Sequence, residues 1–367
     1  MASLPGGRVG LHVLAAGVLS VACGTLVLAD QRPQPAKDQK PDAASQAVAA
    51  AQQQEIQSLL RTADAAMSGQ PAPADFPIQF RNDFLKALGN RVWVPITLTM
   101  DPAKVAGQGM ALYLRVVPRG MTVPAAPPPP TDKDKKNPKN AIPAPAPSYP
   151  FEDVSFFDAK IAPGQPIRIA RGIGVPSGSY DLYIVMHERA AGATTAGKTS
   201  VLKKPIEVPN YSNGEFATST VILAERVDQL PAPITPDQQT EHPYAFGQTE
   251  IVLSPEQKFK KSQELIVLMQ IYNPTLTPEK KFNLEATYTF YRQESGGEKR
   301  FNSTEPQTLT ADPMGPGFDP SSGSSIQAGQ GVPLQSFPEG AYRLEIKVTD
   351  KLSAKVLTQN VTFTVTP

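Results

Sequence analysis

The chain has 367 residues, and its 35 lysines and arginines balance 34 aspartates and glutamates, so that the formal net charge is +1 at pH 7. This balance gives no electrostatic reason to expect nucleic acid as a partner, because nucleic-acid binding needs a basic face. Apolar residues make up 40% of the chain, which is enough for substantial cores, and the length fits two domains with extensions. The 39 prolines indicate extended, loop-rich segments.

The first segment has the form of a signal peptide. Arg8 precedes the apolar run LHVLAAGVLSVACGTLVLA, and Ala29 is the small residue that a signal peptidase requires, which predicts cleavage before Asp30. The run is also about long enough for an uncleaved membrane anchor, and Cys23, the only cysteine, leaves lipidation open. All three alternatives predict export, to the periplasm or out of the cell. After cleavage at Ala29 the mature protein would have no disulfide and no cysteine-type zinc site.

A tether and one helix are expected next. Residues 30–42 are rich in Gln, Pro, Lys and Asp, which is typical of a disordered segment. A narrow apolar stripe then follows helical spacing up to Gly69, which can end a helix. The stripe consists of Val48, Ile56, Leu59, Leu60, Ala63 and Met67. We expect a helix that rests weakly on the body or serves as a spacer.

From Phe76 onward the apolar pattern has a period of two, which is typical of half-buried strands in antiparallel sheets. In RVWVPITLTM the aliphatic residues share one face, while the other face carries Arg91, Trp93, Thr97 and Thr99. Pro95 has no N–H group for a sheet ladder, so this segment predicts an edge strand or a bulge. Residues 122–150 form a Pro-rich insertion, which we interpret as an enlarged loop between strands; a spacer or docking strip is the alternative.

One line of sequence occurs twice, as VPSGSYDLYIVMHE and as FPEGAYRLEIKVTD, 162 residues apart. The corresponding positions are Pro176, Gly178 and Tyr180 in the first copy and Pro338, Gly340 and Tyr342 in the second. In each copy the proline and the glycine predict a turn, and a strand follows at once. Strand segments before and after this line also recur in the same order. We therefore predict tandem domains of one type, residues 76–209 and 210–367, with a linker at 210–247 that includes the first strand of the second domain.

Short alternating strands with turns between them predict an all-β fold of two tandem β-sandwiches. The repeated line resembles the end of immunoglobulin-like and fibronectin type III-like domains of bacterial exported proteins, in which the tyrosine often makes a corner hydrogen bond. The resemblance implies that role for Tyr180 and Tyr342. Residues 206–227 and 242–273 are similar to accessory regions of GWxTD-related and von Willebrand-related exported proteins, whose function is generally unassigned. The chain itself has no GWxTD string.

Candidate binding residues come from apolar side chains on expected outer faces. Tyr183 and Val185 make the outer face of the first repeated strand half apolar, whereas the second copy carries charged residues there. The helix, the second domain or an external partner is expected to cover this face, and cover from within the chain is the simplest of these. Tyr211, Tyr244 and Phe246 extend the set toward the row of exposed aromatic residues that a carbohydrate-binding module needs.

The candidates for chemistry are few. His187 and His242 are the only histidines after the leader, neither lies in a recognised motif, and we interpret both as surface or turn residues. Glycine-rich runs lack the ending of a phosphate loop, and acidic loops lack the spacing of calcium sites. We therefore predict neither a cofactor nor a metal.

The sequence thus predicts a non-enzymatic exported protein of the bacterial envelope that binds another envelope or secreted protein through strand edges or loops. It predicts membrane contact only through the N-terminus, and no nucleic acid. A carbohydrate-binding module pair, with polysaccharide as partner, is the alternative. A third hypothesis is a hydrolase, which requires a cleft with His187 or His242 beside a carboxylate.

Overall fold

A computed structural model describes residues 43–105, 109–121, 148–158, 165–189, 197–254, 256–312, 318–320 and 324–367. The expected signal peptide and tether, and residues 122–147 of the Pro-rich insertion, lie outside the described residues. The described chain is mostly β-strand, with a single long helix, which confirms the all-β prediction. None of its helices is long and apolar enough to cross a membrane.

Two sheets enclose the first core. Sheet I has the strand order β5-β4-β7-β8, and in sheet II the strand β3 lies between β6 on one side and β1 and β2 on the other. Their strands are β1 (Gln79–Asn82), β2 (Leu85–Lys86), β3 (Arg91–Met100), β4 (Gly109–Pro118), β5 (Phe151–Asp158), β6 (Ile167–Pro176), β7 (Gly178–Arg189) and β8 (Thr199–Val208). A short 3-10 helix, η1 (Pro102–Lys104), connects β3 to the next segment. Alternate residues such as Ile96, Leu114 and Ile184 are fully buried between the sheets.

Two further sheets enclose the second core. Sheet III has the order β11-β12-β10-β14-β18, with β9 beside β14, and sheet IV has the order β13-β20-β19-β15-β16, with β17 beside β15. Their strands are β9 (Ala217–Thr218), β10 (Ile222–Gln229), β11 (Ala245–Phe246), β12 (Thr249–Leu253), β13 (Lys258–Lys260), β14 (Glu264–Tyr272), β15 (Asn283–Glu294), β16 (Gly297–Ser303), β17 (Gln307–Thr310), β18 (Ile326–Pro333), β19 (Gly340–Asp350) and β20 (Val356–Thr366). This core is rich in aromatic rings, and Tyr342 stacks on Phe363 at 5.3 Å between ring centroids.

The repeated line occupies the same place in both halves. The pairings of β3 with β6, of β4 with β7 and of β7 with β8 recur as those of β14 with β18, of β15 with β19 and of β19 with β20. Gly178 and Gly340 open the equivalent strands with φ values of 152° and 138°, which L side chains rarely adopt. The Tyr180 hydroxyl donates to the Pro176 carbonyl at 3.1 Å, and the Tyr342 hydroxyl donates to the Pro338 carbonyl at 2.6 Å. The expected corner hydrogen bond is therefore present in both copies.

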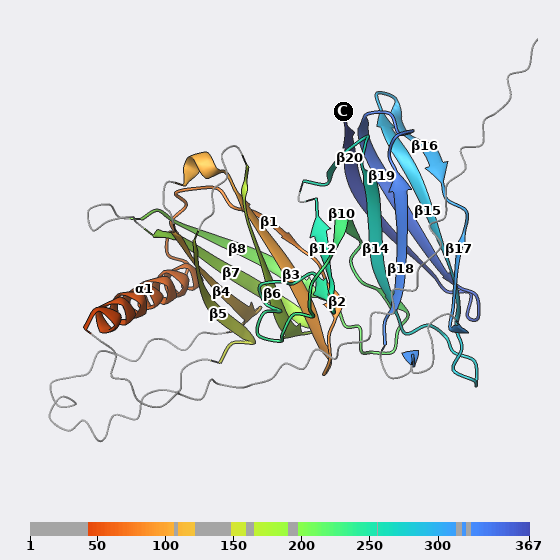
Figure 1. The fold of residues 1–367 in the computed structure, drawn as a ribbon. Coiled ribbons are helices and arrows are strands. Elements are labelled where there is room, and N and C mark those ends of the chain that lie inside the picture. The colour runs from red at the N-terminus through yellow and green to blue at the C-terminus, as the bar shows by residue number, and fades with distance from the viewer. Residues whose placement is uncertain are drawn as a thin grey trace, which may run out of the picture.

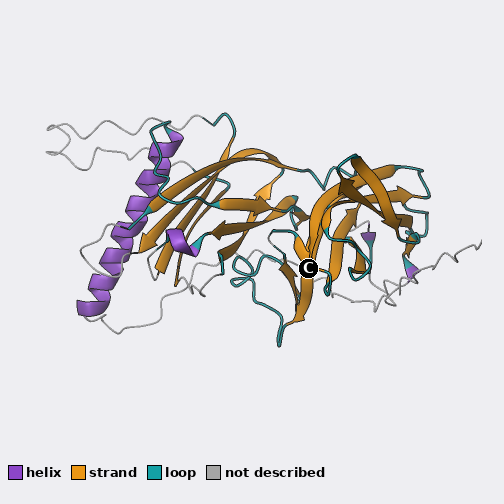
Figure 2. Cartoon of the chain, turned by 90° about the horizontal axis from the view of Figure 1, so that it is seen from above, coloured by secondary structure: helices purple, strands orange, loops and turns teal. Residues whose placement is uncertain are grey.

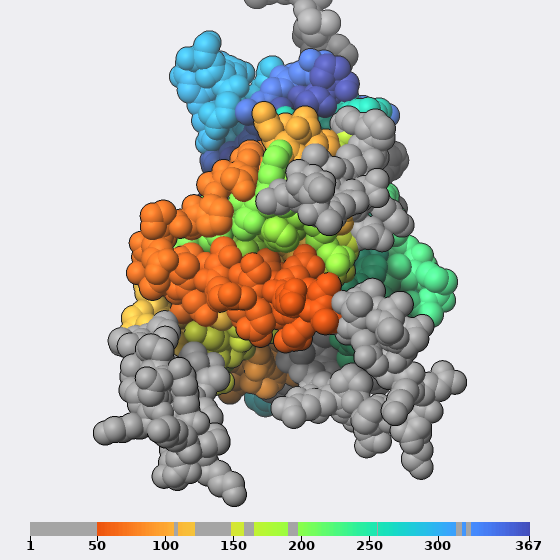
Figure 3. All heavy atoms as spheres, turned by 90° about the vertical axis from the view of Figure 1, so that its left-hand side faces the viewer, coloured from red at the N-terminus to blue at the C-terminus, as the bar shows by residue number. Residues whose placement is uncertain are grey.

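Helix α1 (Ala43–Met67) covers the outer face of sheet I. Leu59 and Ala63 are buried against strand residues of that face, which include Val185. Arg115, on β4, is only 3% exposed and its Nη1 lies 2.5 Å from an Asp64 carboxylate oxygen of the helix. Figure 3 looks onto this end of the molecule and shows the red-orange helix lying across it. Buried contacts and an ion pair thus attach the helix to the sheet, so it is not a free spacer.

Shared apolar cores place the layers in the order α1, sheet I, sheet II, sheet III and sheet IV. The first sandwich lies between α1 and the second sandwich (Figures 1 and 2). Sheet II is therefore covered on both faces, and nearly every residue of β3 is buried. The prediction of an edge strand for residues 91–100 is wrong, because β3 is paired on both sides. The absent N–H of Pro95 faces the interruption between β1 and β2, where the Asp83 N–H donates to the Pro95 carbonyl at 2.9 Å.

Tyr342→Phe and Tyr180→Phe test the corner bonds. Each removes one hydroxyl and leaves a carbonyl without its donor, so we expect each to lower the free energy of unfolding by about 0.5–1.5 kcal/mol. Chemical denaturation measures the change. Tyr291→Phe is the control, because the Tyr291 hydroxyl makes no hydrogen bond within the described chain. Equal stability of all four proteins would contradict a stabilising role for the corner.

Candidate functional site

The first pair of predicted binding residues lies on β7 beneath other parts of the chain. Val185 is fully buried under α1, and Tyr183 is 5% exposed with the Lys203 ammonium 5.4 Å from its ring centroid. The cover of this face therefore comes from within the chain. Neither side chain is available to an external ligand in this structure.

The other predicted aromatic residues gather near the contact between sheets II and III. Tyr211 packs against Tyr272 at 4.6 Å between ring centroids, and Tyr244 is 4% exposed. Phe246 is half-buried and packs on the same group of residues as Tyr244. These three side chains and Tyr183 do not form the row of exposed rings that a carbohydrate-binding surface requires.

We call the contact between sheets II and III the junction. Its apolar centre consists of Leu85, Trp93, Ile222 and Tyr244, all buried, with half-buried Phe246, Ile251, Leu253 and Leu268 around them. The Trp93 indole N–H donates to the Pro243 carbonyl at 2.9 Å, and the Gly172 N–H donates to the Thr240 carbonyl at 2.8 Å. The segment 240–244, which the sequence placed in a linker, is thus bonded to strands β3 and β6.

A buried carboxylate lies at the centre of the junction. Asp83 is 1% exposed and accepts a hydrogen bond from the Tyr244 hydroxyl at 2.5 Å. The Arg81 guanidinium lies 3.7 Å from its other oxygen. Burial raises the pKa of the Asp83 carboxyl above its usual range, although Arg81 and the Tyr244 hydroxyl act in the opposite direction. Burial also raises the pKa of the Tyr244 phenol, so its hydroxyl keeps the proton that it donates to Asp83 at neutral pH.

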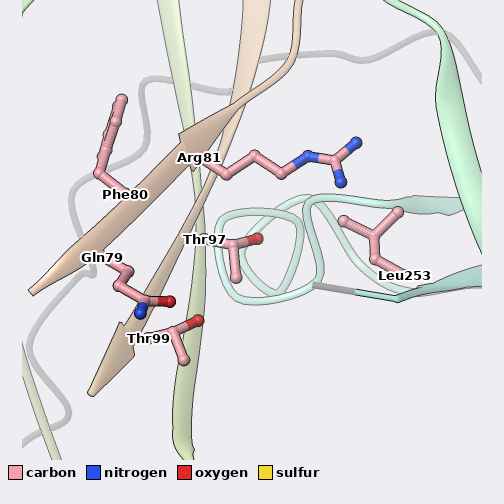
Figure 4. A pocket seen from close by; sticks show the side chains of 6 residues that line it. All are labelled: Gln79, Phe80, Arg81, Thr97, Thr99 and Leu253. Atoms are coloured by element: carbon pink, nitrogen blue, oxygen red, sulfur yellow. The ribbon is translucent and has the colours of Figure 1, made fainter. Parts of the chain in front are cut away.

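A hollow of about 90 Å³ opens beside this carboxylate. It is lined by Gln79, Phe80, Arg81, Thr97, Thr99 and Leu253. Figure 4 shows four polar side chains on one side of β1 and β3, because Gln79 pairs with Thr99 and Arg81 with Thr97, whereas Phe80 points to the other side. The Nη1 atom of Arg81 is buried and has no hydrogen-bond partner among the described residues. These donors can hold a water molecule or a small carboxylate, but the lining contains no acid–base pair for catalysis.

A second hollow, of about 340 Å³, lies beside β6. Its lining comprises Phe157, Arg168, Ile169, Ala170, Arg171, Glu241 and His242. The Nδ1 atom of His242 lies 2.9 Å from a Glu250 carboxylate oxygen, so this histidine does meet a carboxylate next to a hollow. Both side chains are partly exposed, and among the described residues no serine, threonine or cysteine lines the hollow. His187 instead bonds to the Thr199 hydroxyl at 2.9 Å.

In the part of the chain that the structure describes, no group of three histidine, cysteine, aspartate or glutamate side chains is placed to hold a metal ion. One cluster of charges there is that of Arg115, which stacks on Tyr149 at 4.3 Å and bonds to Glu152 at 2.9 Å. It attaches α1 and β5 to β4. We assign it a structural role.

Sequence reasoning missed Asp83, Arg81 and Gly172, and it placed Trp93 on an exposed face. One residue of that face could have indicated burial, because a tryptophan among polar residues favours a strand that is covered on both faces. Nothing in the sequence indicates which segment would cover it.

Comparisons with known proteins add little. No family model matches the chain, and no curated protein matches it. Among the solved structures that it resembles is a calcium-binding mutant of β-glucuronidase 2 of Bacteroides uniformis, at 10% identity and a TM-score of 0.23. The match covers 78% of this chain and 32% of that chain. A likeness at this TM-score carries no argument about the site or the activity.

Gly172→Ala tests the packing of the junction. A Cβ atom at residue 172 would lie 1.9 Å from Cζ2 of Trp93, so the indole must move. We expect a loss of about 1–3 kcal/mol in the free energy of unfolding. We also expect a changed fluorescence spectrum, because Trp93 is the only tryptophan in the chain. Gly296→Ala is the control, since a Cβ there meets open space. Wild-type stability and fluorescence of Gly172→Ala would contradict close packing at this point.

Asp83→Asn tests the buried carboxylate. The pKa of Asp83 is higher in the folded than in the unfolded chain, so the folded state loses stability as the pH rises through the folded value. Asparagine still accepts from Tyr244 but carries no charge. We expect Asp83→Asn to be at least as stable as the wild type at neutral pH, and the wild type to regain the difference as the pH falls toward the unfolded value of about 3.9. Urea unfolding over a pH series measures this.

Asp350→Asn is the control, because the pKa of Asp350 is shifted in the opposite direction to that of Asp83. Burial acts to raise the pKa of Asp350, but hydrogen bonds from groups that include the N–H of Thr275, at 2.8 Å, outweigh it and hold this pKa below its usual range. Its stabilisation is present at neutral pH and is lost as the pH falls through the folded pKa. If both variants changed stability with the same dependence on pH, the assignment for Asp83 would be wrong.

Proposed function

We propose that this chain is an exported, non-enzymatic protein of the bacterial envelope, in which two sandwiches act as one rigid module that binds another protein. The observation that carries the proposal is the junction. Trp93 and Gly172 of sheet II, and Asp83 between β1 and β2, all bond directly to residues 240–244. A junction of this kind resists independent movement of the two halves, which is the ordinary behaviour of linked domains.

Rigidity suits a protein that must present surfaces at a fixed separation. One end of the stack of layers is covered by α1, which follows the predicted tether. At the other end, the outer face of sheet IV is open within the described chain. It carries Arg343, which pairs with Glu298 at 2.6 Å and Glu345 at 3.1 Å and stacks on Tyr291 at 4.1 Å. Such a charged face, at the end of the molecule away from α1, suits a protein partner.

The test is photo-crosslinking in the exporting cell. A crosslinking amino acid is placed at Lys347, which is exposed on the outer face of sheet IV, and at Leu352 in the turn after β19, with Leu88 in the turn between β2 and β3 as the control in the other sandwich. Mass spectrometry identifies what is captured and where the mature N-terminus begins. We expect one dominant envelope protein, captured more strongly from Lys347 or Leu352 than from Leu88. Export without any captured protein from these positions would contradict the proposal.

The hydrolase hypothesis keeps one supporting observation, which is the His242–Glu250 pair next to the hollow beside β6. It predicts turnover of chromogenic ester or glycoside substrates that His242→Ala abolishes without loss of stability. The carbohydrate-binding hypothesis loses its candidate residues, because Tyr183, Tyr211 and Tyr244 are buried. We do not propose a glycan site on them.

A further inference from the structure

Strand β20 is the edge of sheet IV over most of its length. It pairs with β19 along one side, from Val356 to Val365. On the other side β13 pairs only with the end of the strand, from Thr364 to Thr366. Within the described chain, no strand and no backbone hydrogen bond reaches the outer side of residues 356–362.

The backbone groups of this open edge can be identified. The Thr364 N–H donates to Gln257 at 2.8 Å, and the Thr366 carbonyl accepts from Lys261 at 3.0 Å, so even-numbered residues turn their polar groups toward the edge. By strand alternation, the free donors and acceptors are those of Val356, Thr358, Asn360 and Thr362, all of which are exposed. This is a ready template for another strand.

Three other edge strands, β8, β6 and β16, are protected, whereas β20 is not. At β8 the Pro73 carbonyl accepts from Val201 at 2.8 Å, and the residues that follow include two lysines and Pro205. At β6 the Thr240 carbonyl takes the N–H of Gly172. β16 carries three consecutive charged residues, 298–300. In contrast, β20 has the sequence VLTQNVTFTVT, without a charge, a proline or a glycine.

We propose that the open edge of β20 pairs with the same edge of a second copy of this chain, antiparallel, about a two-fold axis at Gln359. The two copies of sheet IV then form one continuous sheet. The proposal concerns self-association and does not depend on the function proposed above.

The side chains of the edge are complementary to themselves in this register. On the inner face Leu357 meets Val361 of the second copy, and both are half-buried apolar residues. On the outer face Thr358 meets Asn360 of the second copy, a polar pair that can hydrogen bond. The pairs Thr358–Asn360 and Val356–Thr362 use the free backbone groups identified above.

Charge selects this register over its neighbours. Lys347 lies beside Thr358 and Glu345 lies beside Asn360 in the pairing of β19 with β20. With the axis at Gln359, Lys347 and Thr358 of one copy lie in one row across the sheet (a rung) with Asn360 and Glu345 of the other copy. Lys347 and this Glu345 are then three strand spacings apart, about 14 Å. An axis at Asn360 would place Glu345 on the same rung as Glu345 of the second copy. An axis at Thr358 would likewise place Lys347 on the same rung as Lys347 of the second copy. The proposed register therefore places opposite charges on these rungs, whereas the registers centred one residue to either side place like charges there.

The first experiment is sedimentation of the full chain over a concentration series. The wild type is expected to show a concentration-dependent monomer–dimer equilibrium, because edge pairing alone buries less surface than a standard interface. Thr358→Lys with Asn360→Lys places like charges opposite each other and is expected to weaken dimerisation roughly tenfold or more. Thr358→Glu with Asn360→Glu is expected to do the same. An equimolar mixture of the two double variants is expected to restore dimers, since lysine then faces glutamate.

Three outcomes would overturn the proposal. These are a wild type that is monomeric throughout the series, a dimer that both double variants leave unchanged, and a mixture that does not regain dimers although both variants show wild-type circular dichroism.

Cysteine crosslinking tests the register independently of the charged variants. In a Cys23→Ser background, Gln359→Cys is expected to form a disulfide between the two copies of the chain. Residue 359 of one copy lies directly opposite residue 359 of the other at the axis. A chain with Leu357→Cys is expected to crosslink to a second chain with Val361→Cys. It is not expected to crosslink to a second chain with Leu357→Cys. Efficient self-crosslinking of Leu357→Cys, or none of Gln359→Cys, would overturn the proposed axis.

Discussion

Trp93 lies directly over Gly172, so closely that a Cβ atom there would meet the indole ring at 1.9 Å. The close approach leaves the Gly172 N–H free to bond to Thr240 and brings Pro243 onto the indole N–H. Tyr244 then follows directly and reaches Asp83. The arrangement of the two sandwiches depends on this sequence of contacts, because each one places the segment that makes the next.

The junction has a cost as well as a benefit. A carboxylate and a phenol are removed from water there, and burial opposes the ionised form of each. The hydrogen bond between them offsets part of this cost, and it also depends on direction and distance in a way that apolar contacts do not. A polar pair in an apolar interface thus specifies one mutual orientation of the sheets, at some expense of stability.

The two copies of the repeated unit have the same topology and different surroundings. Tyr183 and Val185 of β7 are covered by other parts of the chain, whereas the equivalent residues of β19, Glu345 and Lys347, face solvent. The position of each sheet in the stack of layers therefore decides what its outer face must be. Position also decides whether an edge strand is covered. The edge of β6 bonds to the segment that crosses the junction, whereas β20 lies in the last sheet of the stack.

The all-β class, the repeated strand order and the paired corner tyrosines could be predicted from the sequence. These features follow from local signals, namely a period of two, turn residues at fixed spacing, and one line written twice. The tertiary structure decided which faces are covered and where β3 lies in its sheet. Pro95 suggested an edge, but its missing N–H faces an interruption in the partner strand. Tyr244 suggested an exposed aromatic residue, but it completes a hydrogen bond with Asp83, which is 161 positions away in the chain. Such contacts join segments with no common local pattern, so they exist only once the layers have packed.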